Sequence, residues 1–132
     1  STQDANYACK SGNLNTFKSL CELGIMCDND GLTQAAMNGH ADTVRFIYNI
    51  INLKCSKETI INVIKLGYLE CLKAMDVEQF KEFTDLKQIA YNSKQYNIYK
   101  WLPGEDMIDD SIDVKGAVFN DSLFKMEEAF TD

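Results

Sequence analysis

A unit of about 27 residues repeats along this chain, and this repeat constrains the fold more than any other feature of the sequence. The units align on a turn position, which is Gly12, Gly39 and Gly67 in the first three units and Lys94 and Asp121 in the last two. Apolar residues recur four before this position and two, five and eight after it. Such spacings are typical of helices, so each unit is predicted to be a helix, a tight turn and a second helix.

The apolar columns are predicted to form one continuous core. They hold Ala8, Ala35, Val63, Ala90 and Ala117; Leu14, Ala41, Leu69, Tyr96 and Leu123; Phe17, Val44, Leu72, Tyr99 and Met126; and Leu20, Ile47, Met75, Leu102 and Ala129. A single helical hairpin cannot bury its apolar face alone and must stack on its neighbours. The sequence therefore predicts an all-α fold, a short solenoid of about five helix–turn–helix repeats with few or no β-hairpin fingers. The expected units are 4–28, 29–55, 56–83, 84–104 and 105–132, within a single domain of residues 1–132.

The residues at the helix ends support these boundaries. Glycine suits the turn position because a left-handed residue after the first helix strains a Cβ. Pro103 and Gly104 are expected to end the second helix of the fourth unit. Short polar side chains that can cap helix amides mark the starts of helices. The expected caps are Thr33, Ser56, and Thr84 or Asp85 before first helices, and Asn13 and Ser122 before second helices.

The charge of the chain is unevenly distributed. Thirteen Lys and Arg residues against twenty Asp and Glu residues give a net charge of −7, which disfavours nucleic acid as a partner because phosphates need cationic groups. Residues 103–132 hold nine acids and two lysines, and hence all of this net charge. The cluster Asp106, Asp109, Asp110 and Asp113 lacks the Gly and terminal Glu of a calcium loop. We interpret it as a solvated cap, with a partner-facing patch as the alternative.

Five cysteines, an odd number without a CxxC pair, predict free thiols in a reducing compartment. We therefore expect a cytoplasmic protein, in its own cell or in a host cell. A metal site of Cys21, Cys27 and His40 is disfavoured because these residues have no recognised ligand spacing. The sequence has no apolar run long enough to span a membrane and no Gly-rich phosphate loop. We expect no cofactor and no membrane partner.

The second unit resembles a known repeat family. Residues Gly31 to Ile47 read GLTQAAMNGHADTVRFI, which resembles the ankyrin repeat pattern G-x-T-P-L-H-x-A-A-x-x-G-H-x-x-V-V-x-x-L-L. The chain departs from this pattern because it lacks the P-L-H segment and because its period is shorter than the ankyrin period of about 33 residues. Its repeats look like the degenerate, short ankyrin repeats in proteins of large DNA viruses.

The resemblance implies a structural role for His40 and a binding role for the first helices. In ankyrin repeats the ring at the position of His40 bonds backbone near the turn, and the first helices line a concave groove that binds proteins. The positions of this chain that correspond to the groove are candidate partner-binding residues, together with the acidic residues near the C-terminus. The candidates are Tyr7, Lys10, Gln34, Met37, Asn38, Asn62, Lys65, Asn92, Asp109, Asp110 and Asp113.

The sequence contains no recognisable catalytic set and only one histidine. We therefore expect a non-catalytic protein-binding module, an ankyrin-like adaptor or inhibitor, for example a viral protein that binds a host protein. One alternative is a structural or assembly component, in which the chain packs against copies of itself. Another is an immunity-type inhibitor of a toxin.

Overall fold

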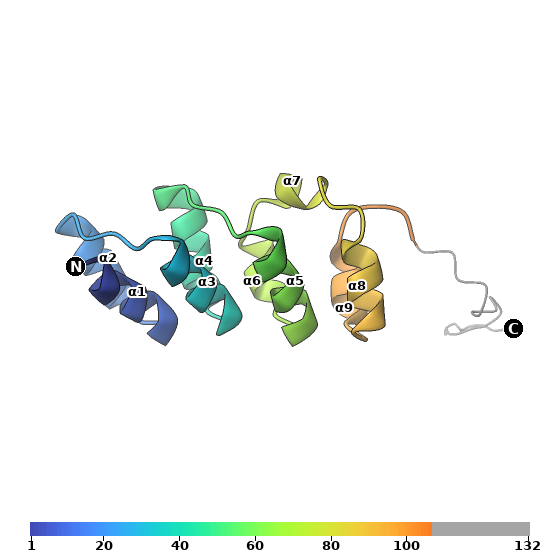
Figure 1. Cartoon of the computed structure of the whole chain (residues 1–132), viewed down its shortest axis with the longest axis horizontal. Helices are drawn as coiled ribbons and strands as arrows, with labels where there is room; N and C mark the ends of the chain where they lie inside the picture. The colour runs from blue at the N-terminus through green and yellow to red at the C-terminus, as the bar shows by residue number, and fades with distance from the viewer. Residues whose placement is uncertain (107–132) are drawn as a thin grey trace, which may run out of the picture.

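The computed structural model describes residues 1–106, and all regular secondary structure in this part of the chain is helical (Figure 1). The prediction of an all-α fold is confirmed for these residues. The elements are α1 (Thr2–Ser11), α2 (Leu14–Glu22), α3 (Asn29–Met37), α4 (Ala41–Phe46), the π-helical turn η1 (Ile47–Ile51), α5 (Lys57–Leu66), α6 (Leu69–Lys73), α7 (Val77–Phe80), α8 (Leu86–Asn92) and α9 (Tyr96–Trp101). Residues 107–132, most of the fifth expected unit, lie outside the described residues, and so do Asp109, Asp110 and Asp113.

The helices form hairpins that stand side by side along the long axis of the molecule (Figure 1). The hairpins of the described part are α1–α2, α3–α4, α5–α6 and α8–α9. The first helix of each hairpin packs against the first helix of the next, α1 on α3, α3 on α5 and α5 on α8, and α4 packs on α6. Consecutive hairpins therefore cover each other's apolar faces, which one hairpin alone would leave exposed.

The turn positions expected from the repeat are confirmed in these hairpins. Gly12, Gly39 and Gly67 have φ angles of 74°, 79° and 83°, in the left-handed region that glycine adopts without strain. Lys94 takes the same place in the fourth hairpin, with φ 64°. The left-handed residue ends the first helix, and the second helix starts two residues later in each case.

Each of these turn glycines also lies under a side chain from the next hairpin. The pairs are Gly12 with His40, Gly39 with Tyr68, and Gly67 with Gln95. A Cβ added to Gly12 would lie 2.5 Å from His40 Nδ1, and one added to Gly67 would lie 2.9 Å from Gln95 Oε1. A Cβ at Gly12 is therefore excluded unless the His40 ring moves, whereas the flexible end of Gln95 could move away from Gly67 and Tyr68 would have to shift only slightly from Gly39.

The apolar columns form the core of the stack. In the column before the turn, Ala8 is 4% exposed, and Ala35, Val63 and Ala90 are fully buried. The buried members of the later columns are Phe17, Val44, Leu72, Ile47, Met75 and Leu102. Tyr96 is the exception at 49% exposure, and its ring packs edge-on against Tyr91.

One expected helix cap is wrong. Thr33 lies inside α3, which begins four residues earlier after Asp28. The Asp30 amide donates to Asp28 Oδ1 over 3.0 Å, and the Asn6 side-chain amide donates to the same oxygen over 2.9 Å. Asp28 is therefore held as a cap by a residue of the preceding hairpin, a contact that the local sequence does not reveal.

The other expected helix ends agree better with the structure. Ser56 caps α5 and Asn13 caps α2, each accepting a hydrogen bond of 3.2 Å from a backbone amide. Asp85 occupies the cap position of α8 without a side-chain cap bond. The chain leaves helical geometry after Trp101, directly before Pro103 and Gly104, as expected.

The connector between the third and fourth hairpins contains α7, a short helix that the repeat does not predict. Gln79 of α7 donates to the Cys55 carbonyl oxygen over 2.6 Å and accepts from the Tyr48 hydroxyl over 2.9 Å. The Tyr48 hydroxyl in turn accepts from the Cys55 amide over 2.8 Å. This network ties two successive connectors together on the side of the stack opposite the turns.

Candidate functional site

The first helices α1, α3, α5 and α8 present one side to solvent, which we call the first-helix face. It consists of the residues nine, five and two positions before each turn, which lie on one side of a helix with 3.6 residues per turn. These residues are Gln3, Tyr7 and Lys10 on α1; Asp30, Gln34 and Met37 on α3; Glu58, Asn62 and Lys65 on α5; and Asp85, Ile89 and Asn92 on or next to α8.

The described candidate residues from the sequence lie on this face or at its edge. Tyr7, the one aromatic residue among the described candidates, is 71% exposed. Lys10, Asn38, Lys65 and Asn92 are exposed, whereas Gln34, Met37 and Asn62 are half-buried between neighbouring helices. The structure places these residues together, and their role in binding stays a prediction.

A shallow depression of about 240 Å³ lies on the face between α1 and α3. Three candidate residues, Tyr7, Lys10 and Gln34, line it, together with Gln3, Asn6 and Asp30. It therefore offers an ammonium, a carboxylate and neutral amides to a ligand. Sequence reasoning missed Asp30, although acids recur nine positions before the turn in three of the four units.

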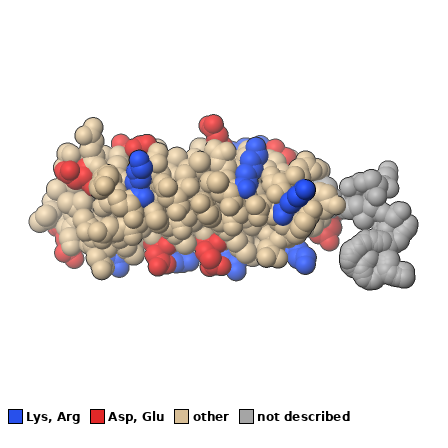
Figure 2. Space-filling view, turned by 90° about the horizontal axis from the view of Figure 1, so that it is seen from below, with Lys and Arg blue, Asp and Glu red and all other residues tan. Residues whose placement is uncertain are grey.

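Unpaired lysines occur on both sets of helices. On the second helices, Arg45 pairs with Asp42 at 2.8 Å and Lys73 with Glu70 at 3.6 Å, whereas Lys18 and Lys100 form no ion pair within residues 1–106. On the first-helix face, neither Lys10 nor Lys65 forms an ion pair with any residue in 1–106. Figure 2 views the turn side of the stack, where Lys and Arg side chains stand apart on a largely uncharged surface and acid–base pairs gather along one edge.

His40 has the structural role that the ankyrin resemblance implies. Its Nε2 lies 2.9 Å from the Lys10 carbonyl oxygen, at the end of α1. The same ring covers Gly12. One nitrogen therefore engages backbone of the preceding hairpin, just as Gln95 donates to the Lys65 carbonyl oxygen over 3.2 Å one step further along.

All five cysteines are free thiols, as expected, and they lie within the described residues. Burial raises the pKa of Cys55 and of Cys71 to about 11. Cys9 and Cys27 share a side-chain hydrogen bond, which lowers the pKa of Cys27 and raises that of Cys9. Within residues 1–106 no three His, Cys, Asp or Glu side chains are grouped so that they could hold a metal ion.

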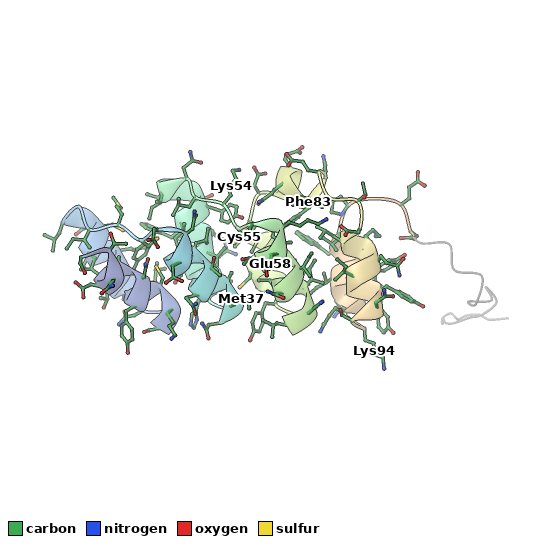
Figure 3. The ribbon with its side chains drawn as sticks, in the orientation of Figure 1. Met37, Lys54, Cys55, Glu58, Phe83 and Lys94 are labelled. Carbon is green, nitrogen blue, oxygen red and sulfur yellow. The ribbon has the colours of Figure 1, made fainter. Side chains whose placement is uncertain are left out.

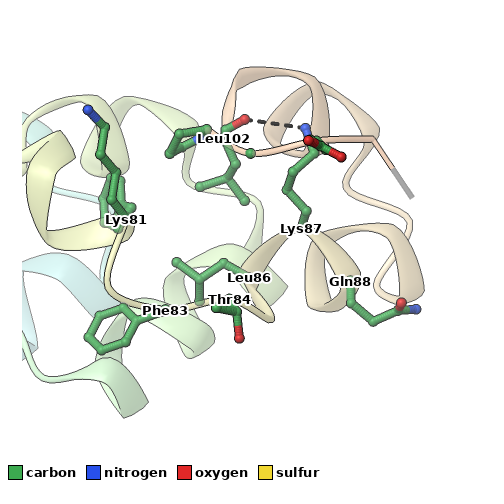
Figure 4. Close-up of a pocket in the computed structure, with 11 residues that line it drawn as sticks. Lys81, Phe83, Thr84, Leu86, Lys87, Gln88 and Leu102 are labelled. Carbon is green, nitrogen blue, oxygen red and sulfur yellow. Dashed lines mark hydrogen bonds between the residues drawn. The ribbon is translucent and has the colours of Figure 1, made fainter. Parts of the chain in front are cut away.

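A larger cavity of about 380 Å³ lies at the far end of the stack, beside the start of α8 (Figure 4). Phe80, Phe83, Leu86 and Lys87 line it, together with the segment 102–105. Lys87 is only 8% exposed, and the sequence analysis missed it.

The buried ammonium of Lys87 is fully engaged. Its Nζ donates to the carbonyl oxygens of Tyr99 over 2.8 Å and of Leu102 over 3.3 Å, and Asp106 lies 3.5 Å away. It thereby caps the carbonyl end of α9. The sequence marks Lys87 as unusual, because the other described units carry the apolar residues Ala5, Leu32 and Ile60 at the same position, seven before the turn.

Comparison with known proteins gives no relative: no family model matches the chain, and neither do any curated protein or solved structure. The described part contains no helix that is both long and apolar enough to cross a membrane.

Proposed function

We propose that the chain is a non-catalytic protein-binding module, an ankyrin-like solenoid that receives a protein partner on its first-helix face. The observation that carries the proposal is the continuity of this face across four hairpins, with exposed groups that the fold itself does not use. Tyr7 is 71% exposed, and the ammonium groups of Lys10 and Lys65 have no ion-pair partner within the described residues.

The rigidity of the face supports this proposal. Each first helix is held by its own second helix and by its neighbours in the stack. A partner would therefore meet a preorganised surface, and association would lose little free energy to ordering of the chain. The mixture of tyrosine, methionine, amides and charged side chains suits protein recognition. An adaptor, an inhibitor of a host protein and an immunity-type inhibitor of a toxin would all use such a face.

A second candidate function, an assembly component, is favoured by a different observation. Leu23, Ile50 and Val77 are spaced 27 residues apart on the connector side and are 77%, 65% and 42% exposed. These large apolar side chains, one after each of the first three hairpins, could pack against a copy of the chain. Sedimentation over a range of protein concentrations separates the two functions, because only assembly predicts a defined oligomer that Ile50→Gln dissociates.

Site-specific photo-cross-linking tests the binding proposal. A photoreactive residue replaces Tyr7 or Asn62 on the first-helix face, or Ser19 or Asn97 on the second helices as matched exposed controls. We expect the first pair to cross-link a discrete protein in the native cell and the control pair to yield none. Cross-links from the second helices alone, or from none of the four positions, would count against the proposal.

A further inference from the structure

A line of lysines borders the first-helix face along the turns. This lysine rim consists of Lys10 and Lys65, in the last turns of α1 and α5, and Lys94, which follows α8. All three side chains are exposed, and Figure 3 shows Lys94 pointing away from the end of its hairpin. None of them forms an ion pair within residues 1–106.

A line of acids borders the same face at the opposite ends of the helices. This acidic rim consists of Asp30 and Glu58, in the first turns of α3 and α5, and Asp85, which precedes α8. Asp85 pairs with Lys57 at 3.2 Å, whereas Asp30 and Glu58 have no ion-pair partner among the described residues. The two rims carry equal and opposite formal charge.

The space between the rims has a defined width. Glu58 and Lys65 are seven residues apart on α5, which separates them by about 10 Å along the helix axis at 1.5 Å per residue. The row between the rims is uncharged and consists of Tyr7, Gln34, Asn62 and Ile89. Seven residues are too far apart for an ion pair along one helix, so Glu58 and Lys65 do not neutralise each other and stay available to a partner.

The placement of these charges also favours the helices themselves, because acids stabilise the start of a helix and lysines its end. That benefit does not require the charges to lack partners. The second helices show that this chain can pair its charges locally, as Asp42 does with Arg45 and Glu70 with Lys73. Of the six charges in the two rims, only Asp85 is ion-paired among the described residues. Two lines of opposite sign on the face proposed for binding therefore indicate the charge pattern of the partner.

We infer that the partner presents an α-helix with an acidic edge and a basic edge, which lies along the stack between the two rims; this inference rests on the proposed function. An α-helix is about 10–12 Å wide with its side chains, which matches the separation of the rims. Neighbouring first helices pack about 8–10 Å apart, so four of them support a helix of about 20 residues. Charges of one sign would recur about every seven residues on each edge, since seven residues rise about 10.5 Å.

A synthetic helix of about 20 residues serves as the probe. It carries Glu along one edge, Lys along the other, and Ala and Leu on the side that faces the stack. A second peptide of the same composition carries both signs mixed on each edge, and a third has a central Pro that breaks the helix. Binding to the isotopically labelled full chain is followed by NMR at low and high salt.

We expect the first peptide to shift the resonances of Tyr7, Gln34 and Asn62, and to bind on the order of tenfold more tightly than the other two peptides at low salt. The variant K10Q/K65Q/K94Q should weaken binding by a similar factor. Its matched control, K18Q/K73Q/K100Q, removes the same charge from the second helices and should bind as the unaltered chain does. Equal binding of the peptides, equal loss in the two variants, or no binding of the first peptide would overturn the inference.

The cross-linking experiment separates this inference from the proposed function. If Tyr7 still cross-links a natural partner in the K10Q/K65Q/K94Q chain with undiminished yield, the face binds a protein but the charged rims do not select it. The inference would then fail while the proposed function stands. If neither Tyr7 nor Asn62 cross-links a protein in the unaltered chain, the proposed function fails first.

Discussion

Gly12 is constrained twice, by its own backbone and by the ring of His40. Its φ of 74° disfavours any residue with a Cβ, and an added Cβ would lie 2.5 Å from that ring. Gly24 has a similar φ of 83°, but nothing lies within 4 Å of the place of its Cβ. A comparison of the two glycines therefore distinguishes the effect of backbone strain on stability from the effect of the contact between hairpins.

We expect Gly24→Ala to lower the free energy of unfolding by about 1 kcal/mol, through left-handed backbone strain alone. Gly12→Ala should lower it by about 2–4 kcal/mol, because the His40 ring must also move. Urea unfolding of both variants measures the difference. Truncation of the ring in Gly12→Ala/His40→Ala should recover part of the additional loss, and equal effects of the two single substitutions would contradict the close approach.

The hydrogen-bond partners of Lys87 can be identified only in the folded chain. Its column predicts a buried apolar residue, since Ala5, Leu32 and Ile60 fill that column in the other described units and are buried. Lysine is tolerated because its ammonium reaches the carbonyl oxygens of Tyr99 and Leu102. The partners lie 12 and 15 residues away in the sequence, so the column alone could not identify them.

At the scale of the helix, the start of α3 depends on the ionised carboxylate of Asp28. Hydrogen bonds from Asn6 and from the Asp30 amide hold the pKa of Asp28 below its ordinary value of 3.8. A carboxyl whose pKa is lowered by folding stabilises the folded state above its ordinary pKa, and this contribution is lost as the pH falls through the lowered value. The hydrogen bonds of Asp28 should therefore weaken in acid.

We expect the thermal unfolding midpoint of the unaltered chain to exceed that of Asp28→Asn at neutral pH, and the difference to shrink as the pH falls from about 5 to about 2. Asparagine keeps an oxygen that can cap the helix but does not titrate. Asp30→Asn is the matched control, because the Asp30 side chain lies in the first turn of the same helix and forms no ion pair among the described residues. A pH-independent difference for Asp28→Asn would refute the role of ionisation.

The helices that the sequence predicted are those specified by local chemistry. The turns at Gly12, Gly39 and Gly67 and the caps at Asn13 and Ser56 depend on residues within one unit, and the repeat identified them. α7 was missed because Gln79 is positioned by hydrogen bonds to Tyr48 and Cys55 of the preceding connector. The cap at Asp28 was missed for the same reason, since its partner Asn6 is 22 residues away.

Only some residues of the first-helix face could be predicted from the sequence. The resemblance to ankyrin repeats indicated which side of the first helices to consider, and residues such as Tyr7 and Asn62 followed from it. The acidic rim was overlooked although its column is visible in the sequence, because its importance depends on which charges remain unpaired. Pairing depends on side-chain distances between helices, which no spacing of residues specifies.

At the scale of the whole molecule, the stack should differ in stability along its length. Among the described residues, α3 and α5 pack against a first helix on each side, whereas α1 has such a neighbour on one side only. In stacked repeats, stability is approximately the sum of each unit and its nearest contacts. Units with fewer contacts open at lower free energy.

We expect the backbone amides of α3 and α5 to exchange hydrogen more slowly than those of α1, by on the order of tenfold or more. Hydrogen exchange of the full chain, followed by NMR or mass spectrometry, measures this directly. Salt and pH conditions should be kept constant so that intrinsic exchange rates can be corrected. Uniform protection across the three helices would mean that the stack opens as one cooperative unit, contrary to the expectation.

The contact of each turn glycine with the hairpin that follows limits how the length of the chain can change during evolution. The ring of His40 leaves no room for a Cβ at Gly12, and Tyr68 and Gln95 leave little room at Gly39 and Gly67, whereas Lys94 belongs to the last described hairpin and keeps its long side chain at the same kind of turn. A gene segment that encodes one whole unit can be duplicated or deleted without breaking this rule, because each copy brings both its glycine and its covering side chain. A segment that is not one whole unit would place a turn residue with a large side chain under a large side chain of the next hairpin. Such a chain should therefore lengthen or shorten only by complete units.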